Sequence, residues 1–318
     1  MAITYLAVHQ SIENLNIGKP VVTIGSFDGV HSGHKMLLRR VVDLARRNVC
    51  RSAVITFWPH PRMVLAGEKN APLLLNTLDE KIALLQQTGV DDVVILPFDN
   101  ALSQMSASDF IRNIVVGKLN AHYLVTGRDH RFGKGGRGDV HLLPSLISDC
   151  NIRTEVIDLK MLDKKIGSSA IRNALIHGDL QSANEMSGYE YIISGKVVVG
   201  DRLGRTIGFP TVNIETPEYK LIPKEGVYRV KVNTDAENSG TFTRLGMMYI
   251  GKRPVLKQQN APRRVEVNIF DFDEQIYGRE IAFALTHRIR DDINFDSLDR
   301  LAAQLKSDKE NILKIDHK

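Results

Sequence analysis

The chain has 318 residues, of which 43% are hydrophobic and 25% are charged, and its formal net charge is +5. This length allows two domains with separate cores, and the composition is ordinary for a globular protein. The sequence has no Lys/Arg block interleaved with aromatic residues, so nucleic-acid binding is not indicated. No apolar run approaches the roughly 18 residues that a membrane span needs.

Cysteine usage and the N-terminus indicate where the protein works. Cys50 and Cys150 are the only cysteines, and they form no CxxC pair. The N-terminal segment has no basic start followed by an apolar stretch, as a signal peptide would have. We therefore expect a reducing, cytoplasmic location without a disulfide framework. The sequence does not indicate whether the protein forms an oligomer.

The first half of the chain alternates between strand-like and helix-like segments. Apolar runs predict strands at residues 21–25, 52–57, 91–98, 121–127 and 153–159. Helical patterns cover residues 35–47, 78–87 and 107–119, and Thr77 with Glu80 forms a capping box at the second of them. This alternation predicts a parallel sheet covered on both faces, with ligands beyond the carboxyl ends of its strands.

The segment from Gly25 to His34, GSFDGVHSGH, lies between the first strand and the first helix. Glycines allow a nucleotide to approach the backbone, and a helix start offers free N–H groups to a phosphate. His31 and His34 are spaced so that two imidazoles can face one phosphoryl group. A metal-binding pair and an incidental pair are the alternatives, although no further ligand set stands nearby at a familiar spacing.

This segment resembles the signature of the HIGH-type nucleotidyltransferases, in the form found in bacterial bifunctional riboflavin kinase/FMN adenylyltransferases (FAD synthetases). TGRDHRFGKGGRGD at residues 126–139 is similar to that family's Gly-x-Asp/Asn-x-x-Phe-Gly loop. IGSSAIRNAL at residues 166–175 is similar to its Ser-Ser-Thr-x-Ile-Arg motif. The resemblance implies that residues 1–185 form a Rossmann-like domain that transfers AMP from ATP to FMN and releases pyrophosphate.

The chemistry of this transfer fits the residue types. FMN carries an ionised phosphate, so the site needs positioning and charge neutralisation rather than a general base. The resemblance implies that His31, His34 and Arg172 are catalytic, with Arg172 on the outer phosphates of ATP. Its other implied ATP- and phosphate-binding residues are Gly25, Ser26, Phe27, Asp28, Gly33, Ser168 and Ser169. Asp129 and Phe132 are implied on the flavin side.

From about residue 186 the pattern changes to strands separated by Gly, Pro and Asn turns. Strands are predicted at residues 189–200, 226–233, 244–251, 263–272 and 279–290, and a helix at 297–313. Residues 186–318 are therefore expected to form a small antiparallel β-barrel with a closing helix. A linker is expected around residues 173–188.

SGKVVVGDRLGRTIGFPTVNI, from Ser194 to Ile214, opens this second domain. It lacks the Gly-Lys-Ser/Thr of a Walker A loop. It resembles the riboflavin kinase signature Gly-x-Val-x-x-Gly-x-x-x-Gly-Arg-x-x-Gly-Phe-Pro-Thr-x-Asn, which implies conversion of riboflavin and ATP to FMN and ADP. The ATP-binding residues implied by this resemblance are Gly195, Lys196, Gly200, Gly204, Arg205, Gly208 and Pro210.

A kinase site for riboflavin needs a base, because the ribityl hydroxyl is a weak nucleophile. Glu266 in RRVEVNIFDFD matches the family's Glu-Val-x-x-Phe-Asp-Phe strand and is the candidate base. Thr211 and Asn213 lie on one face of an extended segment and offer hard oxygen ligands for Mg²⁺. RIRDDINFDSLDRL, at residues 288–301, resembles the family's flavin-covering loop, which implies that Arg290, Phe295 and Leu298 bind flavin.

Departures from the family pattern keep other functions open. Gly167 replaces a serine of the family motif, and Tyr249 and Val255 replace its Asn and Thr in YIGKRPVL. The alternatives are an enzyme with only one of the two activities, or a flavin- or nucleotide-sensing protein. A sensor would need neither a base such as Glu266 nor a phosphate clamp such as Arg172, so the bifunctional enzyme is favoured.

Overall fold

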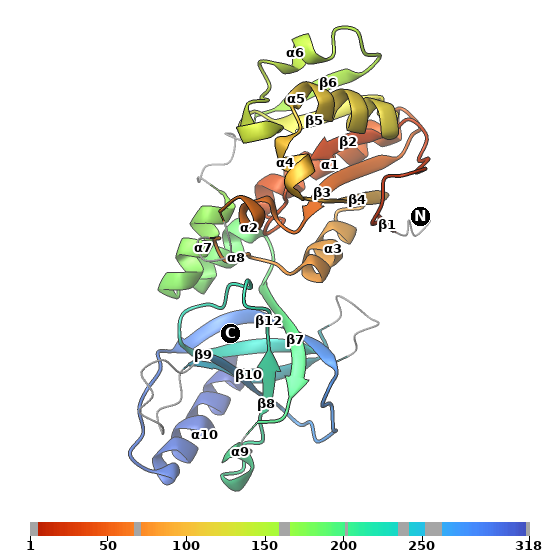
Figure 1. Ribbon diagram of the computed structural model, residues 1–318. Helices are drawn as coiled ribbons and strands as arrows, with labels where there is room; N and C mark the ends of the chain where they lie inside the picture. Colours follow the sequence, from red (N-terminus) through yellow and green to blue (C-terminus); the bar gives the residue numbers. More distant parts are fainter. Residues whose placement is uncertain are drawn as a thin grey trace. The chain divides into compact units, whose positions relative to one another are not determined.

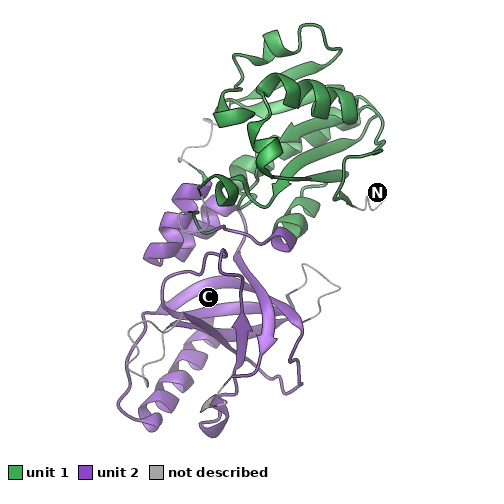
Figure 2. Ribbon diagram, in the orientation of Figure 1, with its two compact units in different colours: residues 1–73, 81–167 green, residues 74–80, 168–318 purple. Residues whose placement is uncertain are grey.

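The computed structural model describes residues 6–66, 71–158, 166–200, 203–234, 242–251 and 263–315. The chain forms two compact units, coloured separately in Figure 2. The first unit comprises residues 1–73 and 81–167, and the second comprises residues 74–80 and 168–318. The second unit therefore includes a short segment from the first half of the chain.

A six-stranded sheet forms the first unit, in the order β1-β4-β3-β2-β5-β6 (Figure 1). Its strands are β1 (Ala7–His9), β2 (Val21–Ile24), β3 (Ser52–Trp58), β4 (Asp92–Pro97), β5 (Tyr123–Gly127) and β6 (Arg153–Ile157). All neighbouring strands are parallel, which confirms the predicted sheet. Its inner strands are continuous apolar runs, because both faces of a parallel sheet are covered.

Helices surround this sheet. They are α1 (Ser32–Arg47), α2 (Pro61–Ala66), α3 (Leu78–Gln86), α4 (Asn100–Gln104), α5 (Ala107–Asp109), the π-helix η1 (Phe110–Lys118), the 3₁₀-helix η2 (Lys134–Gly136) and α6 (Leu143–Leu146). The predicted capping box of α3 is present: Thr77 Oγ1 accepts from the Glu80 N–H at 3.2 Å, and Glu80 Oε2 accepts from the Thr77 N–H at 3.0 Å.

The second unit contains the predicted antiparallel barrel. It is closed, and its strand order is β10-β11-β8-β7-β12-β9 (Figure 1), with β8 outside the predicted strands. The strands are β7 (Tyr191–Val198), β8 (Val212–Glu215), β9 (Gly226–Asn233), β10 (Arg244–Gly251), β11 (Arg264–Ile269) and β12 (Glu280–Arg290). A short helix α9 (Leu203–Thr206) precedes β8, and α10 (Leu298–Lys314) is the expected closing helix.

The stretch expected as a linker is instead folded. It forms α7 (Ser168–His177) and α8 (Leu180–Ser187). Ile171, Leu175 and Leu180 from these helices are buried in the same core as the barrel strands. The apolar residues recur at helical spacing, and burying them outweighs the Gly and Asp turn between the helices.

Residues 74–80 are anchored in the second unit by a buried ion pair. Lys220 Nζ donates to Glu80 Oε2 at 2.5 Å and to the carbonyls of Leu75 at 2.6 Å and Ile192 at 2.7 Å. The Lys220 side chain is 0% exposed. Glu80 Oε1 also accepts from the backbone N–H of Ser194 at 2.8 Å and from its hydroxyl at 2.7 Å. The charges are thus hydrogen-bonded throughout, as buried charges must be.

Candidate active sites

The first candidate site is the turn between β2 and α1. Within it Phe27 and Val30 adopt φ of +49° and +32°, and Gly29 adopts +88°. Positive φ is strained for residues with a Cβ, so the surrounding structure must hold this turn in place. A Cβ at Gly25 would lie 3.1 Å from the Phe27 ring, so glycine lets that ring pack under the backbone.

The two histidines are held together at the start of α1. His31 is the N-cap, and its Nδ1 accepts the backbone N–H of His34 at 3.4 Å. The imidazole rings stack with centroids 3.6 Å apart. Because Nδ1 of His31 is an acceptor, its ring proton belongs on Nε2, which is left as a donor. His34 Nδ1 is buried and has no hydrogen-bond partner in the described part of the chain.

Burial sets the charge of this pair. Desolvation lowers the pKa of His31 to about 4. The pKa of His34 also lies well below its ordinary value, through burial first and the charge of His31 second. Both imidazoles are therefore neutral near pH 7. They can donate or accept hydrogen bonds at a phosphate, but they bring no positive charge of their own.

The other residues predicted for this site fall into two groups. Asp129 and Phe132 follow β5, which pairs with β2, so this loop leaves the sheet at the same edge as the turn. Asp129 is exposed, whereas Phe132 is only 8% exposed and packs in the core of the first unit. Ser168, Ser169 and Arg172 lie in the first turns of α7 in the second unit, and Arg172 is buried.

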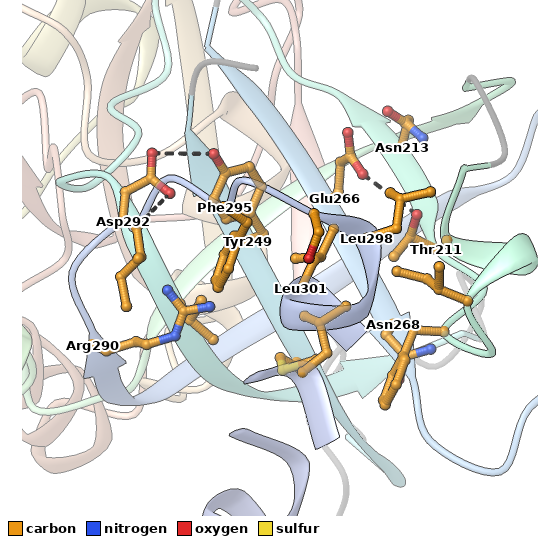
Figure 3. Close-up of a pocket in the computed structure, with 18 of the residues that line it drawn as sticks. Thr211, Asn213, Tyr249, Glu266, Asn268, Arg290, Asp292, Phe295, Leu298 and Leu301 are labelled. Atoms are coloured by element: carbon orange, nitrogen blue, oxygen red, sulfur yellow. Dashed lines mark hydrogen bonds between the residues drawn. The ribbon is translucent and has the colours of Figure 1, made fainter. Parts of the chain in front are cut away.

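The second candidate site is a cavity of about 760 Å³ in the second unit (Figure 3). One part of its wall is polar and another part is apolar. The polar lining residues are Thr211, Asn213, Tyr249, Glu266, Asn268, Arg290, Asp292, Asp296 and Ser297. The remaining lining residues are Gly204, Ile207, Phe209, Val227, Met247, Ile293, Phe295, Leu298, Leu301 and Leu305. A mostly apolar cavity with a few convergent polar groups is typical of a small-molecule site.

Glu266 lies at the centre of the polar wall. It is on β11, opposite Asn213 of β8 on one side and Tyr249 of β10 on the other. The hydroxyl of Thr211 donates to Glu266 Oε2 at 3.4 Å. A Cβ at Gly200 would lie 1.9 Å from Asn213 Nδ2, so only glycine leaves room for this amide. Gly200 thus makes space for the Asn213 side chain in this position.

The end of β12 and the loop that follows it form another part of the wall. Arg290 donates through Nε to the buried carboxylate of Asp308 at 2.9 and 3.1 Å, and its guanidinium lies 5.9 Å from the ring of Phe295. The Tyr249 hydroxyl donates to Asp292 Oδ2 at 3.2 Å. Burial and, next, the charge of Asp292 raise the pKa of Tyr249, so the phenol stays protonated and remains a donor. This bond connects β10 to the loop (Figure 3).

The cavity brings together many, but not all, of the residues predicted for a kinase site. Gly204, Thr211, Asn213, Glu266, Arg290, Phe295 and Leu298 line it. Gly195, Lys196, Gly200, Arg205, Gly208 and Pro210 are not among its lining residues, and their assigned roles stay predictions. Val255 lies outside the described residues.

Sequence reasoning missed several contributors. Asp292 and the apolar Met247, Leu301 and Leu305 line the cavity without having been assigned a role. In the first unit, buried Lys81 reaches the backbone of the turn at Ser26. Asp292 stands inside the quoted loop motif and could have been found there, whereas nothing in the local sequence marks Lys81.

The described residues contain no group of three or more His, Cys, Asp or Glu side chains arranged to hold a metal ion. Among the same residues, no helix combines the length and the apolar character needed to cross a membrane.

Comparison with known proteins covers both units. The FAD synthetase family model matches residues 14–171, and the riboflavin kinase model matches residues 187–315. A bifunctional riboflavin kinase/FMN adenylyltransferase from Bacillus subtilis (strain 168) is 35% identical over 93% of this chain and 92% of that protein. A protein of the same name from Haemophilus influenzae is 38% identical over 91% and 92%. A crystal structure from Streptococcus pneumoniae, described as a macrolide-efflux protein, aligns with a TM-score of 0.81 and 28% identity over 96% of this chain and 97% of that chain.

Proposed function

The chain belongs to the family of bifunctional riboflavin kinase/FMN adenylyltransferases, and from this premise we propose how its two sites divide the work. It is an enzyme that phosphorylates riboflavin to FMN and adenylylates FMN to FAD. The cavity of the second unit carries out the first reaction, and the turn at the start of α1 serves the second. The observation that carries this assignment is the convergence of Thr211, Asn213 and Glu266 on one cavity wall.

In the kinase reaction, Glu266 is the proposed general base. The ribityl hydroxyl oxygen forms a bond to the γ-phosphorus of ATP, the bond from that phosphorus to ADP breaks, and the hydroxyl proton passes to the Glu266 carboxylate. The apolar part of the cavity, with Phe295 and Leu298, accommodates the flavin ring. Arg290, which is bonded to Asp308, holds its side of the wall in place for the flavin.

The chemistry of the polar wall fits Mg²⁺. The Thr211 hydroxyl and the Asn213 amide offer hard oxygen donors beside Glu266, and Mg²⁺ in phosphoryl-transfer sites usually takes only one or two protein ligands besides phosphate and water. Thr211 and Asn213 would hold the ion, which would neutralise charge on the outer phosphates of ATP. Gly195, Lys196, Gly200, Gly204, Arg205, Gly208 and Pro210 are proposed to shape the ATP side of this site.

In the adenylyl transfer, no base is required. A phosphate oxygen of FMN forms a bond to the α-phosphorus of ATP, and the bond to pyrophosphate breaks. His31 donates through Nε2 to the α-phosphate, and His34 and the first N–H groups of α1 stabilise the developing charge. Gly25, Ser26, Phe27, Asp28 and Gly33 form the rest of the turn.

The remaining assignments for this reaction concern segments that lie later in the sequence than the turn. Ser168, Ser169 and Arg172 are proposed to bind the leaving pyrophosphate, and Asp129 and Phe132 to border the flavin. We assign adenylyl transfer to residues 1–185 and kinase activity to residues 186–318. The free thiols of Cys50 and Cys150 and the use of ATP support a cytoplasmic location.

Product analysis tests the proposal directly. Purified protein is incubated with riboflavin, ATP and Mg²⁺, and the flavins are separated by HPLC. FMN and FAD are both expected. FMN alone would mean that the first site is inactive, and the absence of both products would indicate a flavin- or nucleotide-binding protein instead of an enzyme.

A further inference from the structure

Lys81, in α3, is a buried lysine that the reaction scheme above does not use. It is 4% exposed. Its ammonium donates to Thr56 Oγ1 at 3.1 Å, to the Ser26 carbonyl at 3.3 Å and to the Phe57 carbonyl at 3.4 Å. These three neutral acceptors account for all three N–H bonds of the ammonium. The positive charge is therefore fixed in one place inside the first unit.

The position of this charge relates it to the adenylyl-transfer site. The Ser26 carbonyl immediately precedes Phe27, which has φ of +49°. Thr56 donates to the same carbonyl at 3.3 Å, so Lys81 and Thr56 together tie the strained turn to the end of β3. Strained backbone persists only where its surroundings hold it, and Lys81 is one of the groups that do so.

A purely structural role would not require a charge here. Burying an ammonium is costly, and apolar residues of similar volume often fill such space at lower cost. The site has a use for the charge, because His31 and His34 are neutral while both substrates are polyanions. Lys81 places a cation against the backbone of the turn that is proposed to bind those phosphates.

We propose that Lys81 is a positioning residue for adenylyl transfer: its ammonium fixes the Ser26 carbonyl and so orients the Gly25–His34 turn toward the α-phosphate of ATP. The inference rests on the proposed function of the first unit. It differs from that proposal because Lys81 acts through the turn and not by contact with the substrate.

The protonation state of Lys81 gives a readout specific to this role. Burial lowers the pKa of Lys81 to about 8, and the nearby charge of Asp28 opposes the shift. Asp28 comes from the turn, whereas Thr56 and Phe57 of β3 offer uncharged oxygens. As pH rises through about 8 the ammonium loses its proton, so kcat for FAD formation should fall. FMN formation by the same chain, at a site in the other unit, is the internal control.

The test compares Lys81→Met and Lys81→Arg with wild type from pH 6.5 to 9.5. Lys81→Met should lower kcat for FAD formation by roughly 10- to 100-fold, with KM for ATP changed less, because the loss is one of orientation. Lys81→Arg keeps a charge that does not titrate in this range. Its residual FAD formation should therefore lack the alkaline decline of wild type. Lys19→Met, which removes an exposed lysine of the same unit, is the matched control and should behave as wild type.

The outcomes separate the possible failures. A Lys81→Met enzyme with normal kcat, or a Lys81→Arg enzyme with the same alkaline decline as wild type, would overturn the positioning role. If Lys81→Met does not fold, the pH profiles of wild type and Lys81→Arg still decide the question. Failure of the wild-type chain to make FAD from FMN and ATP would instead refute the function on which the inference rests.

Discussion

The two candidate sites of this chain differ in how they are built. The turn at the start of α1 is built from strained backbone and two buried, neutral imidazoles. The second site is an open cavity of about 760 Å³ whose wall is made of side chains and includes a carboxylate beside a hydroxyl. Under the proposed assignment, the difference follows from the nucleophile that each site serves. An ionised phosphate needs only orientation and charge stabilisation, whereas a hydroxyl needs a base.

Removal of the proposed base, Glu266, should have the largest effect and is the strongest test of the difference between the two sites. Glu266→Gln keeps the shape of the side chain and removes its basicity, so kcat for FMN formation should fall by about 10²–10⁴. FAD formation from added FMN should not change, because that reaction needs no base. Steady-state kinetics of both half-reactions on one preparation give the answer. A near-normal kcat for FMN formation would remove Glu266 as the base and direct attention to Asp271 or Asp273.

The reciprocal change tests the first site. His31→Asn retains an N-cap residue for α1 but removes the imidazole donor, so folding is preserved better than in His31→Ala. Both variants should lose about 10²–10³ in the rate of FAD formation while FMN formation stays intact. Equal loss of both activities in folded protein would argue against separate sites.

The free energy of unfolding can also be compared between the two units. Glu80→Gln leaves the buried Lys220 ammonium without a carboxylate, which should destabilise the second unit by about 3 kcal/mol. Trp58, the only tryptophan, belongs to the first unit, so its fluorescence follows that unit during urea unfolding while circular dichroism follows both. A Glu80→Met/Lys220→Met double variant should recover part of the loss. An unchanged unfolding midpoint in Glu80→Gln would contradict the anchoring role of the pair.

The smallest expected effect concerns the bond between Tyr249 and Asp292. Tyr249→Phe keeps the ring in the cavity wall but releases the loop after β12 from β10. KM for riboflavin should rise about tenfold, with little change in FAD formation from FMN. Tyr277→Phe is the control, because Tyr277 is exposed and does not line the cavity. Equal KM values in the two variants would mean that the bond does not help to retain riboflavin.

Patterns with a local cause were predictable from the sequence. Apolar runs separated by helices gave the parallel sheet, alternating strands with glycine turns gave the barrel, and the capping box of Thr77 and Glu80 gave the start of α3. The resemblance of two sequence motifs to the riboflavin kinase family located Thr211, Asn213 and Glu266. These residues meet in the cavity although 55 residues separate Thr211 from Glu266.

Long-range partners were not predictable in the same way. Lys81 stands in a helical pattern where a solvated lysine is the ordinary case, and only the fold turns it toward Ser26 and Thr56. Glu80 was correctly placed in a cap, but its second partner Lys220 is 140 residues away. The linker expected around residues 173–188 is wrong, because burial of α7 and α8 in the barrel's core makes this stretch helical, and that core comes from strands later in the chain.

The anchoring of residues 74–80 has a consequence for synthesis of the chain. Glu80 leaves the ribosome 140 residues before Lys220. At translation rates of about 5–20 residues per second, this segment waits roughly 7–28 s for its partner. The barrel cannot bury Lys220 with its final hydrogen bonds until residues 74–80, which were synthesised earlier, pack beside it. Under the assignment proposed above, the unit that makes FMN is therefore the later of the two to complete its fold.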